Sequence, residues 1–144
     1  MTTLTKRNTE GVLLVSISEA KESKSKNGYS TVEFSFVVVD APNQSDRGQT
    51  IKFQTFFLEN QRGVDQRGIN NLLDFIAAIT GTPLDFGDSV EINDEVLSSL
   101  LQQTVTVRLE TDTFTRSDGT KGNSLKMKEF WPAEDYPEVV NRVF

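Results

Sequence analysis

The stretch YSTVEFSFVVVDAPNQSDRGQTIKFQTFFL, residues 29–58, decides the fold because it contains two long alternating runs on either side of a turn. One face of the first run is apolar, namely Val32, Phe34, Phe36 and Val38. This period of two is that of a half-buried strand. Residues 40–48 are rich in turn formers and contain no apolar run. The stretch therefore predicts a long β-hairpin.

Strict alternation in the second run sorts its side chains into two sets. Its first face consists of Ile51, Phe53, Thr55 and Phe57, and its second face of Lys52, Gln54 and Phe56. If the second face meets solvent, Lys52 and Phe56 place a cation beside an exposed ring. That pairing holds single-stranded nucleic acid, with the cation on phosphate and the ring on a base. Alternatively, Phe56 packs under the connection that follows the strand.

The composition limits the chemistry. A chain of 144 residues forms one ordinary domain with a full core. The chain has no cysteine and no histidine, which excludes disulfides, thiolate catalysis, the usual general base and the commonest metal ligands. No apolar run approaches the ~18 residues of a membrane span. We therefore expect a cytoplasmic protein without cofactor, metal, signal peptide or membrane anchor.

The net charge of −6 is unevenly distributed along the chain. Residues 68–103 and 133–144 together hold nine of the 21 acids but only one of the 15 bases. The remaining, strand-forming part is therefore slightly positive. The acidity of the whole chain weakens long-range attraction of anions but does not exclude anion binding.

A first strand is predicted from Gly11 to Ala20, with Leu13, Val15 and Ile17 on one side. Val12 and Leu14 make the other side apolar too, so this strand is either buried on both faces or contacts another subunit, as in a homodimer. The polar residues 1–10 before it are expected to fray.

A lysine-rich loop follows the first strand. Lys21, Lys24 and Lys26 lead into an Asn-Gly turn that ends at Tyr29. Lysines closed by an aromatic ring are typical of a loop that grips a phosphate chain, although the same loop could simply be solvated.

Two helices and two more strands complete the pattern. Apolar residues three and four apart predict a helix over 69–81 that ends at Gly81, and Asn93 predicts the start of a second helix ending near residue 101. Leu84 and Phe86 between the helices are expected to cover the core. Strands are predicted over 104–114 and 124–131.

Basic and aromatic residues recur on the non-core side of these last strands. Arg108 lies on the polar face of the first, and the turn between them contains Arg116 and Lys121. In the second, alternation separates Leu125, Met127 and Trp131 from Lys126, Lys128 and Phe130. Trp131 is a further ring on which a base is expected to stack.

Five strands with a helical connection between the third and fourth predict an OB-fold, a mainly β, five-stranded Greek-key barrel, over residues 1–132. An OB-fold binds oligonucleotides on strands two and three and through loops one-to-two and four-to-five. The predicted DNA-binding residues are Lys21, Lys24, Lys26, Tyr29, Lys52, Phe56, Arg108, Arg116, Lys121, Lys126, Lys128, Phe130 and Trp131.

Three segments carry a resemblance to a known family. They are ESKSKNGYSTVEFSF (22–36), ITGTPLDF (79–86) and GNSLKMKEFWP (122–132). From about Gly11 to Pro132 the chain resembles short bacteriophage replication-module proteins regarded as single-stranded-DNA-binding. The resemblance implies a non-enzymatic protein that coats single strands, DNA or possibly RNA, during replication or recombination in an infected bacterium. It covers the lysine-rich loop and the closing Lys126, Lys128, Phe130 and Trp131.

The tail, residues 133–144, combines Glu134, Asp135 and Glu138 with an apolar end. Bacterial single-strand-binding proteins commonly end in an acidic run through which replication or recombination proteins dock, but Arg142 interrupts the acids here. The other interpretation is a tail strapped onto the barrel or a neighbouring subunit by Val140 and Phe144.

Two other classes of function remain open. An enzyme would need metal-dependent cleavage by carboxylates such as Asp112 with Asp118, or Asp40 with Asp46, which have no ordered spacing. A small β-barrel that binds protein, as a phage assembly or inhibitor factor, is favoured by the net acidity and the two-faced first strand.

Overall fold

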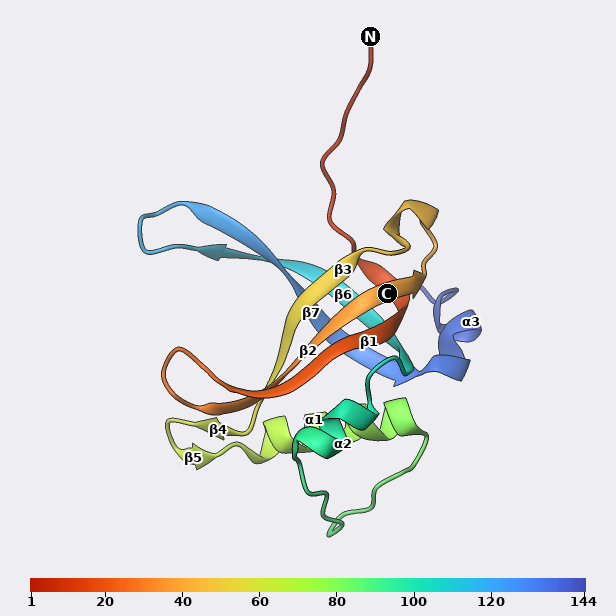
Figure 1. Cartoon of the computed structure of the whole chain (residues 1–144). Helices are drawn as coiled ribbons and strands as arrows, with labels where there is room; N and C mark the ends of the chain where they lie inside the picture. The colour runs from red at the N-terminus through yellow and green to blue at the C-terminus, as the bar shows by residue number, and fades with distance from the viewer.

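The computed structural model describes all 144 residues and is built on one five-stranded antiparallel sheet with the order β3-β2-β1-β6-β7 (Figure 1). Its strands are β1 (Gly11–Lys24), β2 (Ser30–Asp40), β3 (Thr50–Phe57), β6 (Thr104–Thr115) and β7 (Lys121–Pro132). The short strands β4 (Glu59–Asn60) and β5 (Gly63–Val64) form a second, two-stranded sheet. The fold is therefore mainly β, as predicted, and all five predicted strands are present.

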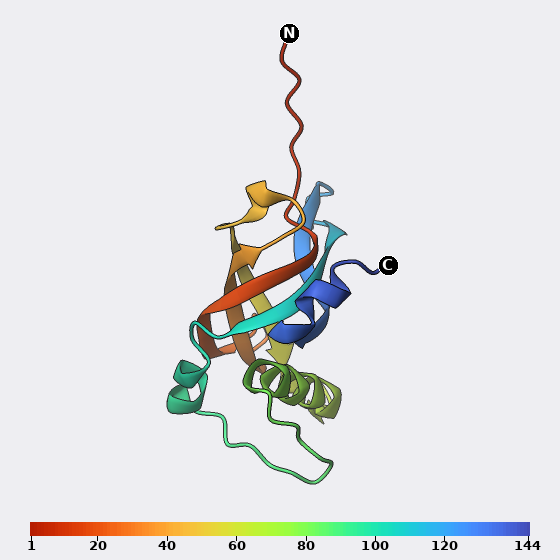
Figure 2. The ribbon, with the colours of Figure 1, turned by 90° about the vertical axis from the view of Figure 1, so that its right-hand side faces the viewer.

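Two helices lie beneath the curved sheet (Figures 1 and 2). Helix α1 (Gln66–Thr80) starts at Asp65, whose side chain accepts a 2.9 Å hydrogen bond from the amide of Gly68. It ends at Gly81, whose φ of 72° is the left-handed conformation that glycine adopts without steric cost. Helix α2 (Asp94–Ser99) starts at Asn93, which accepts from the amide of Val96 at 2.9 Å. Both predicted helices and the predicted caps Gly81 and Asn93 are confirmed, although α1 starts three residues earlier than predicted.

The core lies between the concave face of the sheet and α1. The predicted apolar face of β2 is fully buried. Phe75 of α1 meets the rings of Phe34, Phe56 and Phe130 at centroid distances of 5.0, 5.2 and 5.1 Å. These three rings come from β2, β3 and β7, so α1 packs against both edge strands and against β2.

The second apolar face of β1 is covered by the C-terminal segment, which forms η2 (Ala133–Asp135) and α3 (Tyr136–Val139) (Figure 2). Val12 packs with Tyr136 and Val139 in a small separate cluster, and Val140 lies against it. Burial within one chain thus accounts for both apolar faces of β1. The tail packs onto the sheet of its own chain, as the second interpretation of the tail expected.

A bulge in β3 reverses the alternation expected for this strand. The pairing of β2 with β3 shifts register between Phe34 and Phe36, where Phe53 adopts a φ of 60°. Beyond this point Gln54 and Phe56 face the core, at 5% and 8% exposure. Because an extra residue in one strand moves all later side chains to the opposite face, the prediction of an exposed Phe56 is wrong.

A second bulge lies in β7. Arg108 pairs with Glu129 but Leu109 with Met127, so Lys128 has no partner in the register. Phe130 consequently packs on the core, and Trp131 turns toward the C-terminal cluster. The prediction that Phe130 lies on the non-core side is therefore wrong, for the same reason as that for Phe56.

Strands β3 and β7 are the two edges of the sheet, and no backbone ladder joins them. The side chain of Gln54 bridges them instead. Its Nε2 donates to the carbonyl of Leu125 at 3.0 Å, and its Oε1 accepts from the amide of Met127 at 2.9 Å. We call this contact the Gln54 clasp. The clasp gives the buried side-chain amide of Gln54 the hydrogen-bond partners that it needs away from water, and it fixes the spacing of the two edges.

Replacing Gln54 by leucine is expected to lower the free energy of unfolding by about 1–3 kcal/mol, because both hydrogen bonds of the clasp are lost and the peptide groups of Leu125 and Met127 stay unpaired. Urea unfolding measures the change. Gln103→Leu is the matched control, since it removes one exposed bond to the carbonyl of Ser99. An unfolding midpoint for Gln54→Leu equal to that of the control would contradict this role of the clasp.

The segment between the helices departs from its prediction. Leu84 is half-buried, but Phe86 is fully exposed and does not cover the core. No helix combines the length and the apolar character needed to cross a membrane.

Candidate functional site

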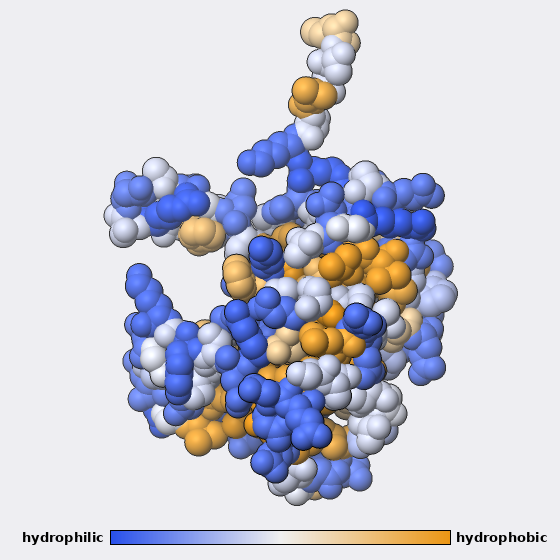
Figure 3. Space-filling model, in the orientation of Figure 1, coloured by the Kyte–Doolittle hydropathy of each residue, from blue (hydrophilic) through white to orange (hydrophobic).

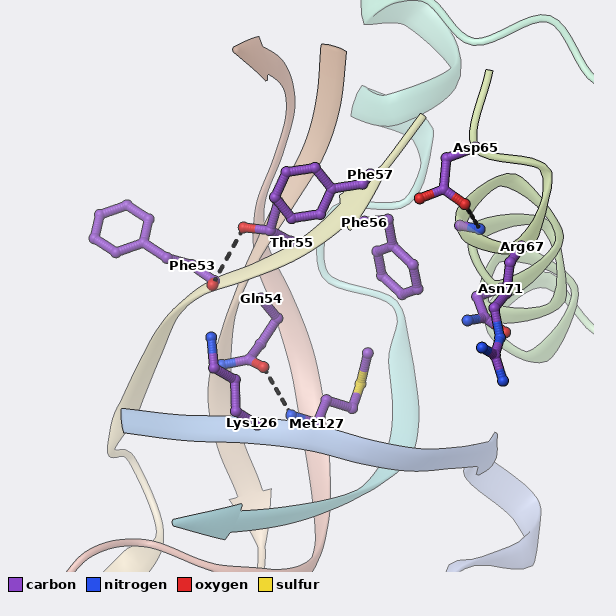
Figure 4. Close-up of a pocket in the computed structure, with 11 residues that line it drawn as sticks. Phe53, Gln54, Thr55, Phe56, Phe57, Asp65, Arg67, Asn71, Lys126 and Met127 are labelled. Atoms are coloured by element: carbon purple, nitrogen blue, oxygen red, sulfur yellow. Dashed lines mark hydrogen bonds between the residues drawn. The ribbon is translucent and has the colours of Figure 1, made fainter. Parts of the chain in front are cut away.

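The open seam between β3 and β7 forms a groove of about 350 Å³ beside the start of α1 (Figure 4). It is lined by Phe53, Gln54, Thr55, Phe56, Phe57, Asp65, Arg67, Gly68, Asn71, Lys126 and Met127. Phe56 and the Gln54 clasp form its floor. Phe53 and Phe57 also line it, with the Phe53 ring projecting outward, and Arg67 and Lys126 reach it from α1 and β7.

Phe53 is held in an unfavourable conformation with its ring in solvent. Its φ of 60° is one that a side-chain-bearing residue adopts at a cost of about 1–2 kcal/mol. The ring is 61% exposed, so little burial offsets that cost, and in Figure 4 it projects away from the sheet. Strained backbone of this kind persists only where the surrounding structure holds it in place, and it is found most often at functional sites. Phe57, 41% exposed, adds a second accessible ring near the groove.

The basic side chains divide into two groups by their partners. Six of them form ion pairs: Arg7, Lys21, Arg47, Arg108, Lys128 and Arg142. The other nine have no carboxylate within ion-pair distance: Lys6, Lys24, Lys26, Lys52, Arg62, Arg67, Arg116, Lys121 and Lys126. A cation without an internal partner is free to bind an external anion.

Two of the unpaired cations, Arg67 and Lys126, line the groove. Most of the others lie on the β1–β2 tip, β3, the β4–β5 tip and the β6–β7 hairpin, and these tips reach one side of the molecule in Figure 1. Lys6 lies on the N-terminal segment. The space-filling view shows a hollow on that side between two projecting arms with hydrophilic surfaces (Figure 3). Despite the net charge of −6, this side thus offers cations around exposed rings.

Several predicted residues lie at the hairpin tips, as expected. Lys26 is exposed, Tyr29 is half-buried, and Lys24 donates to the hydroxyl of Ser30 at 2.8 Å. At the other tip, the guanidinium of Arg116 donates to the carbonyl of Lys121 at 2.8 Å. The Lys121 ammonium is exposed and unpaired.

Arg116 also lies over the ring of Phe114, at 5.3 Å from its centroid. Lys21 differs from the other lysines of its loop because it pairs with Glu19 at 3.0 Å. The hydrogen bond and charge of Glu19 raise the pKa of Lys21 above its ordinary value. Lys21 is therefore less available to an external phosphate than Lys24 or Lys26.

Arg108 and Trp131 lie away from the groove, under the C-terminal segment. Arg108 pairs with Glu129 at 2.7 Å and with Glu110, and its pKa is raised, first by the hydrogen bond to Glu129. Phe144 covers both residues, with its ring 4.9 Å from the Arg108 guanidinium and 5.9 Å from the Trp131 ring.

Lys128 is also occupied, because it pairs with Asp112 at 3.0 Å. Of the predicted residues, Lys126 and Phe56 therefore line the groove, and Phe56 forms part of its floor. Lys52 is exposed on β3, the strand that also contains Phe56.

Sequence reasoning missed Phe53, Phe57 and Arg67. Strict alternation assigned both rings to the core face, and Arg67 stood before the helix predicted over 69–81. A signal was present, because Ile51, Phe53, Phe56 and Phe57 place large apolar residues on both parities of one strand. Such a break is typical of a bulge.

The carboxylates considered for metal-dependent cleavage are each engaged elsewhere. Asp112 pairs with Lys128, Asp40 with Arg47 and Asp46 with Arg7. Asp118 accepts from the hydroxyl and the amide of Thr120, which lower its pKa. No three acidic side chains gather closely enough to hold a metal ion.

Comparison with known proteins gives no family assignment, since no protein-family model and no curated protein matches the chain.

Proposed function

We propose that this protein binds single-stranded DNA, without enzymatic activity, along the groove between β3, β7 and the start of α1. The observation that carries the proposal is Phe53, an exposed ring in a strained conformation, with the unpaired Lys52 next to it in sequence and the unpaired Lys126 lining the same groove. Rings for bases and cations for phosphates are the two components of single-strand binding.

The topology supports the same proposal. The sheet order β3-β2-β1-β6-β7 and the helix between β3 and β6 agree with an OB-fold whose closure depends on the Gln54 clasp rather than on a ladder. An OB-fold binds its ligand between the two hairpin tips, and Lys24, Lys26, Arg116 and Lys121 occupy those tips.

In this mechanism, bases stack on Phe53 and Phe57, and each engaged ring contributes about 1–3 kcal/mol. Lys52, Arg67 and Lys126 neutralise phosphates beside them. Since every base presents a face to stack on, sequence preference is slight. The proposed setting is the coating of single strands during phage replication or recombination in the bacterial cytoplasm, in keeping with the resemblance to phage single-strand-binding proteins.

A labelled oligothymidine of about 16 nucleotides, the upper site size of one OB-fold, is expected to bind, and duplex DNA of the same length should fail to displace it. Lys52, Arg67 and Lys126 alone contribute about −2 to the slope of the logarithm of the binding constant against that of the salt concentration, and each further phosphate contact makes the slope steeper by about 0.7. Fluorescence anisotropy at several salt concentrations measures both. Absence of binding at low salt would overturn the proposal.

Two lysines on one strand make a matched pair for this titration. Lys126→Ala removes an unpaired groove cation and should reduce the slope by about 0.7. Lys128→Ala removes a lysine two residues further on that is paired with Asp112, and it should leave the slope unchanged.

The alternative function, a protein-interaction module, is favoured by one observation. Phe86 is fully exposed between Asp85 and Asp88, in the acidic segment between the helices. The same titration separates the two functions, because a protein-binding module would not bind the oligothymidine at any salt concentration.

A further inference from the structure

A second concave site lies between the N-terminal segment and the β6–β7 hairpin, with a volume of about 760 Å³. It is lined by Lys6, Arg7, Asn8, Glu10, Thr111, Arg116, Lys121, Gly122 and Asn123. None of these side chains is hydrophobic. The site is thus unsuited to a base or another apolar ring and suited to a charged, strongly hydrated group.

The N-terminal segment is fixed beside the hairpin although it forms no strand. The carboxylate of Glu10 accepts from the amide and hydroxyl of Thr111 at 3.1 and 2.8 Å, and Asn8 donates to the same hydroxyl at 3.3 Å. Arg7 pairs with Asp46 at 2.6 Å. Residues 7–10 are therefore anchored, contrary to the fraying expected from sequence, and they bring Lys6 to the hairpin.

The charges of this site favour an anion. Arg7 is neutralised by Asp46, and the Glu10 carboxylate is occupied by Thr111. Lys6, Arg116 and Lys121 remain, and none of them has a carboxylate partner.

The hairpin also fixes the direction of the Arg116 guanidinium. Besides the carbonyl of Lys121, it donates to the hydroxyl of Thr120 at 3.4 Å and lies over the Phe114 ring. Asp118, in the same turn, is held by Thr120 and is not among the lining residues.

We propose that this site is a phosphate subsite, formed by the N-terminal segment and the β6–β7 hairpin, for the backbone of a strand that leaves the groove. The inference rests on the proposed function and extends it. Strand β7 connects the two places, because Lys121 at the subsite and Lys126 at the groove are separated by ~17 Å of extended chain. A strand long enough to span both sites contacts both, and a short one fills only the groove.

The experiment compares Lys6→Ala/Lys121→Ala with the wild type, using oligothymidines of about 6 and about 16 nucleotides, within the range of single-OB-fold site sizes. Both lysines are exposed and unpaired, so the fold should be unaffected. With the long strand, the salt slope should be smaller by about 1.4 in the double variant; with the short strand it should be unchanged. Arg47→Ala/Arg142→Ala removes the same charge from two cations that already have partners, and it should change neither slope.

Three outcomes would count against the subsite. An unchanged slope with the long strand would overturn it while leaving the groove intact. An equal loss with both strands, or an equal loss in the control variant, would mean that the lysines act through overall charge. If the wild type binds neither strand, the proposed function fails and the subsite with it.

Discussion

Phe53→Gly is expected to weaken binding of oligothymidine by about 5- to 150-fold, which is the loss of one stacked base worth roughly 1–3 kcal/mol. The same substitution should leave the free energy of unfolding unchanged or raise it by up to about 1 kcal/mol. Glycine adopts a φ of 60° without steric cost, and the exposed ring contributes little to the core. Fluorescence anisotropy and urea unfolding of the same preparation measure the two effects.

The chain contains its own control for the backbone effect. Apart from Phe53, Gln102 is the only non-glycine residue with a positive φ, which is 67°. It lies between α2 and β6, outside the groove. Gln102→Gly should relieve similar strain and leave binding unchanged. Phe86→Ala tests the loss of an exposed ring elsewhere. If Phe53→Gly binds as tightly as these two controls, Phe53 is not a stacking platform.

Phe56→Ala, three residues further along β3, is expected to lower the free energy of unfolding by about 3–5 kcal/mol. Its ring is buried at 5.8 Å from that of Phe34 and 5.2 Å from that of Phe75, so truncation leaves a cavity in the aromatic cluster. Urea unfolding followed by far-UV circular dichroism measures the loss.

Phe57→Ala is the matched control for the core prediction, because it removes a partly exposed ring from the next position and should cost less than half as much stability. Equal costs for the two variants would mean that the bulge at Phe53 is absent and that the alternation of β3 is regular.

Most of the architecture could be predicted from local patterns. The face of β2, the periodicity of α1 and the caps Asn93 and Gly81 depend on residues close in sequence. The bulges could not be predicted in this way. Their positions depend on the partner strand, and one extra residue exchanges every side chain that follows, as with Phe53 and Phe56 in β3 and with Phe130 and Trp131 in β7.

The hairpin tips beside the candidate site could be predicted, but the groove between β3, β7 and α1 and its exposed rings could not. The hairpin tips followed from the order of the strands, because a turn rich in lysine or arginine stays exposed wherever its hairpin ends. The availability of each cation did not follow. Arg108 meets Glu129, 21 positions away in sequence, only because β6 pairs with β7 in this register, and Phe144 then covers it.

The Gln54 clasp also protects the molecule from its own copies. Strands β3 and β7 are edge strands, and apart from the two groups of β7 that Gln54 bonds, their outer peptide groups pair with no neighbouring strand. Such edges are templates for pairing between molecules. An edge released from the clasp is free to pair with the edge of another chain. We expect the Gln54 side chain, by keeping the two edges together, to favour the monomer over a domain-swapped or fibrillar assembly. Concentration-dependent aggregation should then be the first effect of its loss.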